Sequence, residues 1–523
     1  MNLFKYIRLR CVRFLEFFSL DSGRRFAKQS SKKISYCGNE SLVLIEANLS
    51  PLSQLSLKFS LPAVCKFFSA APVSYCSMPA GNLVKIKEKI RHYFSFYRII
   101  GVETFYLFNS NVSNPQNIID AKTILAKIEA KDEFEKIQYR NILIGDLVYD
   151  HFLRTTHQAT LDLMDSRLVG ELARAILFVD QVYDYMTQNN VRAVIVGETC
   201  YRNAIPARVA IYLGAKAFYI SGQFIYNLDK DVMHASLEAH FYPEIFQGLP
   251  KSIQLKGLNV AQQSLKNVES SQTFIGHKDE LSFPKKSFNN RLKILIMAHD
   301  FFDSPHAYGT NLFPDSWEWL NAIGEISSNT NHLWFLKAHP YARAGNEVFL
   351  SRIAEKFPNL HLVKKETPNN VLVQMGLDAV LTVYGTAGSE FPIWNIPVLN
   401  ASRVNPHVKY SFNIHPQSKE EFISILSDLP NKLKNFNFEF ESLLEFYFMH
   451  HIYRRKSFLF KNYEQMCEVV ETTKKGMTWN VFRYTGESYM FSAQQIEESV
   501  SLFLESGDYF LSRAHSKTIS YGV

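Results

Sequence analysis

Three loops in the second half of the chain combine imidazole, carboxylate, ammonium and glycine residues. They span residues 299–306, 337–340 and 384–390. Imidazole and ammonium groups donate to phosphate oxygens, and glycine lets the backbone come close to a ligand, so this set is suited to a phosphorylated ligand. Each loop follows a short apolar run that is typical of a buried strand. If the strands are parallel, the loops meet at one edge of the sheet and form one site.

The loop at residues 384–390 reads Tyr-Gly-Thr-Ala-Gly-Ser-Glu. Gly385 and Gly388 permit close approach of the backbone to a ligand, and Thr386 can cap a helix whose free N–H groups attract phosphate. Glu390 lies one turn inside that helix, where a carboxylate can accept the two hydroxyls of a ribose. The pattern fits an ordinary helix cap about equally well. The predicted nucleotide-binding residues of this loop are Tyr384, Gly385, Thr386, Ser389 and Glu390.

The step Lys337-Ala338-His339-Pro340 follows the strand-like run 333–338. A residue before proline is held extended, which places His339 at the edge of the sheet. Its imidazole can donate to a phosphate oxygen, and Lys337 and Arg343 add positive charge. A single histidine at a strand end is more often structural, but beside the glycine-containing loop it favours a donor-binding role for Lys337 and His339.

The third loop holds two carboxylates and two imidazoles within the eight residues 299–306. In a two-domain enzyme it would face the cleft between the domains, where it can contact donor phosphates or assist proton transfer. The spacing matches no strong metal pattern, so phosphate contact is favoured over zinc and no metal is predicted. The residues are His299, Asp300 and Asp303 as a phosphate or cleft loop, and His306 as a candidate catalytic residue.

Short apolar strands alternate with helical patterns around these loops, which predicts a doubly wound parallel sheet. The predicted strands are 293–298, 333–338, 360–363, 379–383 and 397–399, with helices near 314–323, 346–356, 369–375 and 387–394. A fainter series precedes it, with strands 42–47, 104–108, 141–145, 193–196 and 217–220 and helices 161–187 and 204–212. Residues 50–140 otherwise give no clear division.

These patterns divide the chain into six predicted parts. They are a basic amphipathic leader (1–35), an N-terminal Rossmann-like domain (36–250), a polar linker (251–290), a C-terminal Rossmann-like domain (291–435), closing helices rich in Phe and Tyr (436–475) and an appendage (476–523). In the appendage, Ser492 and Gln495 form a capping-box pattern and Gly507 ends the helix.

The chain has 523 residues, of which 46% are hydrophobic and 20% charged, with a net charge of +7. This balance indicates a folded protein of two or more domains, and no motif for nucleic acid accompanies the mild positive charge. The six cysteines form no CxxC pair, which is typical of free thiols in a reducing compartment. No apolar run is long enough to span a bilayer and no signal-peptide core is present, so we expect a cytoplasmic protein. The basic leader is equally compatible with an anionic membrane surface and with a solvated segment.

Over residues 293–400 the chain resembles the capsule polysaccharide biosynthesis glycosyltransferases, a group that includes Kdo-transferase-like proteins. The resemblance rests on an ordered set: the loop 299–306, the helix start Phe313–Leu320, the Lys-x-His-Pro step, the Gly-Thr-x-x-x-Glu loop and the strand beginning Pro397-Val398. It implies a GT-B fold, in which two Rossmann-like domains face a cleft and the second domain binds the nucleotide donor without a metal or other cofactor.

The first half resembles the family more faintly. Residues 144–150 look like its Gly-Asp-Leu-Ile-Tyr-Asp step, and Glu198–Tyr201 with Arg208 look like its Asp-x-x-Tyr segment, but Ala204-Ile205 stands where the family usually has a glycine. A carboxylate at the end of a strand here can deprotonate an acceptor hydroxyl. The candidate catalytic residues are therefore Glu198, Asp146 and Asp150, although the two aspartates fit a helix cap as well.

The resemblance implies a glycosyltransferase that uses a nucleotide-activated donor, with CMP-Kdo favoured, to extend a glycan or glycolipid acceptor of a bacterial capsule or surface polysaccharide. If the leader binds an anionic membrane surface, the protein would associate with the inner face of the inner membrane; no nucleic-acid partner is expected. Two alternatives remain open. A CDP-polyol phosphotransferase of the teichoic-acid type shares the His-Pro step, and a degenerate transferase would serve as a non-catalytic capsule-assembly scaffold.

Overall fold

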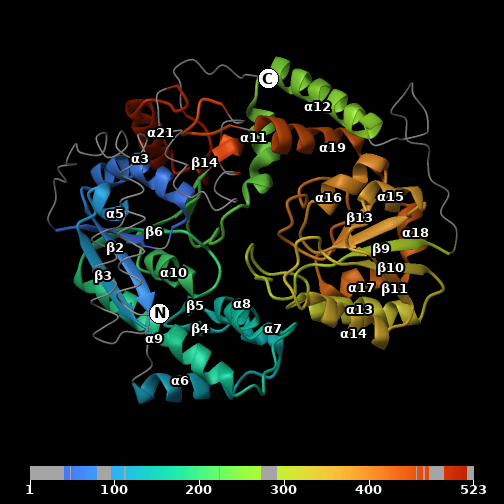
Figure 1. Ribbon diagram of the computed structural model, residues 1–523, viewed down its shortest axis with the longest axis horizontal. Coiled ribbons are helices and arrows are strands. Elements are labelled where there is room, and N and C mark those ends of the chain that lie inside the picture. Colours follow the sequence, from blue (N-terminus) through green and yellow to red (C-terminus); the bar gives the residue numbers. More distant parts are fainter. Residues whose placement is uncertain are drawn as a thin grey trace.

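The computed structural model describes residues 40–47, 49–78, 96–110, 114–222, 224–271, 291–454, 456–462, 466–469, 471 and 488–514. The predicted leader lies outside these residues. Figure 1 shows two α/β bodies side by side, one coloured mainly blue to green, with the red helix α21, and the other yellow to orange; α12 and α19 lie above the second body and α11 lies between the two. Two Rossmann-like domains with a helical C-terminal part were predicted, and the strand orders below confirm this α/β fold class.

The N-terminal domain is built on a sheet of seven strands in the order β14-β8-β7-β6-β1-β2-β3. The five strands β7-β6-β1-β2-β3 are parallel, and β8 and β14 add antiparallel edges. From β1 the chain first adds strands on one side, β2 and then β3, and later adds β6 and β7 on the other side. The strand order therefore reverses between β1 and β6, and a doubly wound sheet binds its ligand at this point. The strands are β1 (Leu42–Glu46), β2 (Ala71–Met78), β3 (Thr104–Asn109), β6 (Val191–Val196), β7 (Lys216–Ile220), β8 (Ile225–Leu228) and β14 (Phe510–Leu511).

Helices cover both faces of this sheet because its strands are apolar on both sides. One face packs on the amphipathic helix α9 (Arg167–Gln188) with α8 (Gly145–Thr156) and α10 (Ile205–Tyr212), and the other packs on α3 (Pro51–Phe68) and α21 (Ala493–Ser506). Ser50 caps α3 and Pro51 occupies its first turn. The small helices α5 (Phe96–Ile99), α6 (Pro115–Leu125) and α7 (Lys131–Phe134) complete the domain.

One predicted strand of the first half has a different place. Residues 141–145 contribute only β5 (Ile142–Leu143), which pairs with β4 (Gln138–Tyr139) in a separate hairpin. Gly145 then begins α8, and a Cβ at this position would lie 2.0 Å from the carbonyl oxygen of Phe134. Only glycine fits against that carbonyl, so Gly145 allows the chain to turn sharply into α8 instead of continuing as a strand.

The C-terminal domain is a five-stranded parallel sheet in the order β11-β10-β9-β12-β13. Its winding reverses between β9 and β12, so its ligand-binding edge lies at the loops after those two strands. The strands are β9 (Lys293–Met297), β10 (Leu333–Lys337), β11 (Leu360–Val363), β12 (Ala379–Thr382) and β13 (Val398–Asn400). The helices are α13 (Ser316–Ser328), α14 (Asn346–Lys356), α15 (Asn369–Gln374), α16 (Ala387–Glu390), the 3₁₀ segment Phe391–Trp394, α17 (Lys419–Ser427) and α18 (Leu429–Lys434).

The two domains are joined by helices that pack on one another. Half of the predicted linker is the helix α12 (Lys251–Ser271), which packs with α11 (Tyr242–Gly248), α19 (Phe440–Tyr447) and the π-helical turn Phe448–Tyr453 around Phe446 and Phe448. After these helices the chain returns to the N-terminal domain, where α21 packs on α3 and β14 extends the sheet (Figure 1). The C-terminal appendage is thus part of the first domain.

In the described part of the chain, none of the helices combines the length and the apolar character that a bilayer crossing requires. Four of the six cysteines fall in this part, and all four are free thiols: Cys65, Cys76, Cys200 and Cys467.

Candidate functional site

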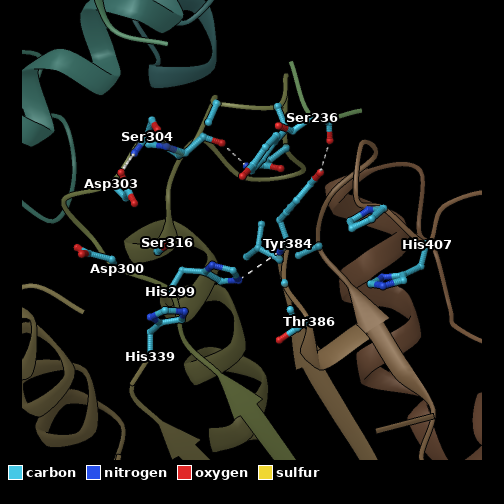
Figure 2. A pocket seen from close by; sticks show the side chains of 18 of the residues that line it. Ser236, His299, Asp300, Asp303, Ser304, Ser316, His339, Tyr384, Thr386 and His407 are labelled. Atoms are coloured by element: carbon cyan, nitrogen blue, oxygen red, sulfur yellow. Dashed lines mark hydrogen bonds between the residues drawn. The ribbon is translucent and has the colours of Figure 1, made fainter. Parts of the chain in front are cut away.

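A cavity of about 690 Å³ lies at the ligand-binding edge of the C-terminal sheet and reaches across to the N-terminal half. The loops after β9, β10 and β12 form one wall, and Figure 2 shows His299, His339, Tyr384 and Thr386 gathered there. Ser236 and Glu238 of the N-terminal half line the opposite side. The three loops that the sequence singled out therefore meet at one site, as parallel strands require.

His299 sits at the point where the winding reverses. Its Nε2 accepts the backbone N–H of Tyr384 at 3.2 Å, so β9 and β12 are joined at their carboxyl ends. Burial and the nearby His339 lower the pKa of His299 to about 4, which keeps this ring neutral at neutral pH. Because Nε2 accepts, the proton of the neutral ring is on Nδ1. His299 positions the loop that carries Tyr384.

His339 lies beside His299 with the two rings 6.4 Å apart and nearly parallel (Figure 2). The backbone N–H of Tyr341 donates to its Nδ1 at 3.2 Å, which leaves Nε2 as the protonated nitrogen of the neutral ring. The side chain is half-buried and lines the cavity. Its Nε2–H can therefore donate to an oxyanion bound there.

Asp300 and Asp303 line the cavity together with Arg343. The Nη1 of Arg343 donates to Asp300 at 3.0 Å and its Nη2 donates to Asp303 at 3.2 Å, while Asn346 donates a further hydrogen bond to Asp300 at 2.9 Å. The two predicted cleft carboxylates thus hold the Arg343 guanidinium at the cavity wall. The remaining N–H groups of Arg343 are thereby held in a fixed place at the cavity.

Two aromatic rings form a flat surface in the cavity. Tyr308 and Tyr384 stack with their ring centres 3.9 Å apart and their planes 8° apart, and both line the cavity. The Tyr384 hydroxyl lies 3.5 Å from the Ser236 carbonyl oxygen of the other half (Figure 2). Tyr308 was not singled out from the sequence, because nothing but its position two residues after His306 distinguishes it from the other 25 tyrosines.

Lys337 and Glu390, which were predicted to contact the donor, lie behind the loops and do not line the cavity. The Lys337 ammonium donates to the Thr367 carbonyl at 2.6 Å and to Asn369 at 2.8 Å, and Asn369 donates to Glu390 at 2.7 Å. This network ties α15 to α16. Their neighbours Gly385, Thr386 and Ser389 do line the cavity.

The two glycines of this loop have different roles. A Cβ on Gly385 would meet the His299 ring at 3.6 Å and the Thr382 hydroxyl at 3.7 Å, which are ordinary contacts, whereas a Cβ on Gly388 would lie 2.5 Å from the His407 ring. Gly388 is thus required by the protein's own packing and not by a ligand. Thr386 makes no side-chain capping bond to α16, so its exposed hydroxyl remains available at the cavity.

His306 does not line the cavity, and its ring is buried between two carboxylates of the N-terminal domain. Its Nδ1 lies 2.6 Å from Asp150 and its Nε2 lies 2.9 Å from Glu135. Burial alone lowers the pKa of this imidazole, but the two carboxylates outweigh burial and raise the pKa to about 10. A catalytic role was predicted for His306 and Asp150, but the geometry favours a structural contact between the domains. We call the three residues His306, Asp150 and Glu135 the interdomain clasp.

The other aspartate of this helix is also fully engaged. Arg208 donates to the two oxygens of Asp146 at 2.6 and 2.5 Å, and both side chains are buried. The guanidinium outweighs the cost of burial and lowers the pKa of Asp146. A carboxylate held in this way is a poor base, so the geometry favours a structural role for Asp146 over the catalytic one predicted.

Further contacts across the domain boundary surround the clasp. Asp315, the N-cap of α13, accepts hydrogen bonds from Tyr149 at 2.5 Å and Thr160 at 2.6 Å. Lys131 pairs with Glu318 in the same helix turn. The start of α13 therefore docks on the first domain through its own capping residues.

Glu198 follows β6 and is exposed. Partial desolvation of the Glu198 carboxyl raises its pKa, and so does the negative charge of Asp303. The positive charge of Arg154 lowers this pKa. Arg154 in turn lies 3.6 Å from Asp303 of the cavity. Among the predicted catalytic carboxylates, Glu198 is the one that is solvent-accessible and close to a residue lining the cavity.

A second carboxylate lies at the same strand edge and was missed by sequence reasoning. Glu46 ends β1, and it accepts the Gly197 N–H at 2.8 Å and the Asn203 amide at 3.1 Å. Burial, together with Glu198, outweighs these two hydrogen bonds and raises the pKa of Glu46 to about 7. The available signal was a carboxylate closing the apolar run Leu42–Glu46, at the end of a strand.

Within the residues that the structure describes, no group of three or more His, Cys, Asp or Glu side chains is arranged to hold a metal ion.

Neither the protein-family models nor the curated proteins gave a match to this chain. Several solved structures are similar to it. UDP-GlcNAc 2-epimerase from Neisseria meningitidis is 11% identical, over 79% of this chain and 98% of that one, with a TM-score of 0.25. The β-Kdo 2,7 transferase KpsC of Thermosulfurimonas dismutans is 12% identical, over 51% of this chain and 79% of that one, with a TM-score of 0.31. The fold assignment rests on the strand orders given above. Kdo transferases, which the sequence motifs resemble, are thus among the solved structures similar to this chain.

Proposed function

We propose that this chain is a glycosyltransferase that moves a sugar from a nucleotide-activated donor to a hydroxyl of a growing bacterial surface polysaccharide. The observation that carries the proposal is the cavity of about 690 Å³ at the winding reversal of the C-terminal sheet, lined by His339, Arg343 and the stacked pair Tyr308 and Tyr384. A doubly wound sheet binds nucleotides at this position. In this proposal residues 291–435 bind the donor and residues 36–250 bind the acceptor.

The donor phosphate would lie against His339 and Arg343. The Nε2–H of His339 and the free N–H groups of Arg343 then stabilise the negative charge that grows on the phosphate as the bond to the sugar breaks. The stacked tyrosines offer a flat apolar face to a base or sugar ring. Gly385, Thr386 and Ser389, in the same wall of the cavity as His339, would hold the ribose or the phosphate.

Glu198 is the base in this scheme. It accepts the proton of the acceptor hydroxyl, whose oxygen bonds to the anomeric carbon while the nucleotide leaves with the electrons of the broken carbon–oxygen bond. Because the site lies between two domains, bound substrates exclude water and limit hydrolysis of the donor. The choice of a CMP-activated ulosonic acid such as Kdo as the donor, and of a capsule glycan at the inner membrane as the acceptor, rests on the motif resemblance alone.

The test is a thermal-shift screen with CMP, CDP, UDP and GDP, because a ligand that binds the native state raises its melting temperature. We expect CMP to give the largest shift and His339→Ala to remove most of it. His361→Ala, which changes an exposed histidine on β11, serves as the control and should respond like the unmodified protein. The proposal fails if none of the four nucleotides shifts the melting temperature.

The two enzymatic alternatives, a glycosyltransferase and a polyol phosphotransferase, are then distinguished by the substrate from which CMP is released. Release of CMP from CMP-Kdo supports the glycosyltransferase, whereas release of CMP from CDP-glycerol identifies a polyol phosphotransferase. A scaffold would release neither and would be indifferent to His339→Ala.

A further inference from the structure

A second cavity, of about 550 Å³, lies in the N-terminal domain at the carboxyl edge of its sheet. Among the described residues, Ser77 at the end of β2, Ser110 after β3 and Asn203 after β6 line it, together with residues of α8 and α9. It shares none of its described lining residues with the first cavity. The proposed donor therefore does not occupy it.

Two arginines give this cavity a positive charge. Arg174 donates to Glu171 at 2.5 Å, and Arg202 lies 3.8 Å from the other oxygen of the same carboxylate. The remaining titratable lining residue, His151, accepts a hydrogen bond from Arg202 at 2.7 Å. Burial, with the two guanidinium charges, lowers the pKa of His151 to about 3, so this ring is neutral. Two positive charges thus face one negative charge.

The arrangement leaves donors directed at the cavity. A guanidinium carries five N–H groups, and in the described part of the chain Arg174 and Arg202 each use one nitrogen in a hydrogen bond within the protein. The Glu171 carboxylate and the His151 ring fix the two side chains, so little conformational freedom is lost when they bind a ligand. Ser77 and Ser110 add hydroxyl groups to the same wall.

The second cavity is also connected to the proposed base. Asn203, which lines it, donates to Glu46, and Glu46 accepts the N–H of Gly197 directly before Glu198. On the other side, the Tyr201 hydroxyl donates to Asp303 of the first cavity at 2.9 Å. The segment 197–203 therefore separates the two cavities and carries the base between them.

We infer that the second cavity binds an oxyanion of the acceptor, a carboxylate or a phosphate on the sugar next to the one that reacts. The inference rests on the proposed function where it assigns the ligand to the acceptor. A neutral glycan would offer no negative charge to the N–H groups of Arg174 and Arg202 that Glu171 and His151 leave unused, which disfavours it. The protein therefore selects acidic acceptors over neutral ones.

The test is a ligand-observed NMR titration with three probes. They are the methyl glycoside of a ulosonic acid, its uncharged methyl ester, and a hexose 1-phosphate. We expect the acid or the phosphate to bind at least about tenfold more tightly than the ester, because a hydrogen bond to a charged group contributes that much. The probe that binds more tightly identifies the oxyanion as carboxylate or phosphate.

Substitutions localise the binding. Arg202→Gln and Arg174→Gln should each weaken binding of the preferred anion about tenfold or more, and Arg202→Lys should fall between Arg202→Gln and the unmodified protein. Arg192→Gln changes an exposed arginine of β6 and should bind as the unmodified protein does. A melting curve of each variant separates loss of binding from loss of folding.

The inference is overturned if the ester binds as well as the acid and the phosphate binds no better, or if Arg202→Gln and Arg174→Gln bind the anion unchanged. Its failure is distinguishable from failure of the proposed function, because nucleotide shifts are measured on the same variants. Anion binding without any nucleotide shift would leave the cavity as an oxyanion site but remove its assignment to an acceptor. Nucleotide binding with no preference for anions would leave the transferase and remove the oxyanion site.

Discussion

His306, a residue type often used in catalysis, lies in a buried ion pair with Asp150 and Glu135. Its loop contains three other titratable residues, and a His beside carboxylates is typical of an active site. Its partners, Asp150 in α8 and Glu135 directly after α7, lie more than a hundred residues earlier, so no local pattern could reveal that they enclose it. Only the tertiary contact distinguishes a buried ion pair from an acid–base group.

Replacing His306 should destabilise the protein strongly. His306→Gln leaves Asp150 and Glu135 buried without their positive partner, a change that costs about 3–5 kcal/mol. Denaturant unfolding measures the loss, with His361→Gln on exposed β11 as the control. A loss below about 1 kcal/mol would show that the carboxylates find other partners and that the clasp contributes little.

The same residue predicts a dependence on pH. The folded-state pKa of about 10 lies above the value of about 6.5 that an imidazole has in an unfolded chain. Its stabilising contribution is therefore fully present below about pH 6.5 and is lost as the pH rises through 10. The difference in unfolding free energy between the unmodified protein and His306→Gln should shrink steadily from pH 7 to pH 10. A constant difference over that range would contradict the pairing.

Glu198 and Glu46 share one strand edge but differ in exposure. If Glu198 is the base, Glu198→Gln should lower transferase turnover about 100-fold while the nucleotide-induced melting shift is retained, because general base catalysis contributes about that much. Asp184→Asn on the outer face of α9 is a matched carboxylate control. Unchanged turnover in Glu198→Gln, with a large loss in Glu46→Gln, would move the base to Glu46.

At the scale of the elements, the loops after β9, β10 and β12 were found from the sequence because each follows a short apolar strand and precedes a helix start. The N-terminal domain was harder. Pro62 lies inside α3, and the strand β2 follows it after only two residues, so neither a helix period nor a turn marks the boundary. Helix α12 was read as a linker because its apolar side is narrow and packs only on α19 and its neighbours.

Gly388 offers a test at this scale. Gly388→Ala would push its methyl group against the His407 ring, which is buried in the wall behind α16. We expect a loss of about 1–3 kcal/mol from overpacking, together with a weaker nucleotide shift as the loop moves. Gly248→Ala is the control, because a Cβ there meets nothing within 4 Å. Equal stability of the two variants would show that the His407 ring moves aside freely.

At the scale of the whole molecule, two sheets with the same strand order face each other across the cavity. This arrangement was predicted from the family resemblance. The resemblance could not predict where the last described segment, 488–514, would pack. Helix α21 has a clear cap and stripe, yet nothing local indicates that it covers the first domain and not the second. Long-range packing of this kind leaves no mark in the spacing of nearby residues.

Paired substitutions on α21 test that placement. Phe503 is buried against α3 and β7, whereas its neighbour Leu502 is 40% exposed. Phe503→Ala should cost about 3–5 kcal/mol, and Leu502→Ala should change stability by less than about 0.5 kcal/mol. Equal effects of the two substitutions in denaturant unfolding would mean that α21 does not close the core of the first domain.

The return of the chain to its starting domain has a consequence for synthesis. Strand β8 ends at Leu228 and its neighbour β14 begins at Phe510, so the ribosome must make all of the intervening polypeptide before that sheet edge is covered. At about 5–20 residues per second this takes between roughly a quarter of a minute and one minute. During that interval the nascent N-terminal half exposes an uncovered apolar face and an unpaired strand, which makes it a substrate for chaperones, whereas the C-terminal sheet can complete itself as soon as it emerges.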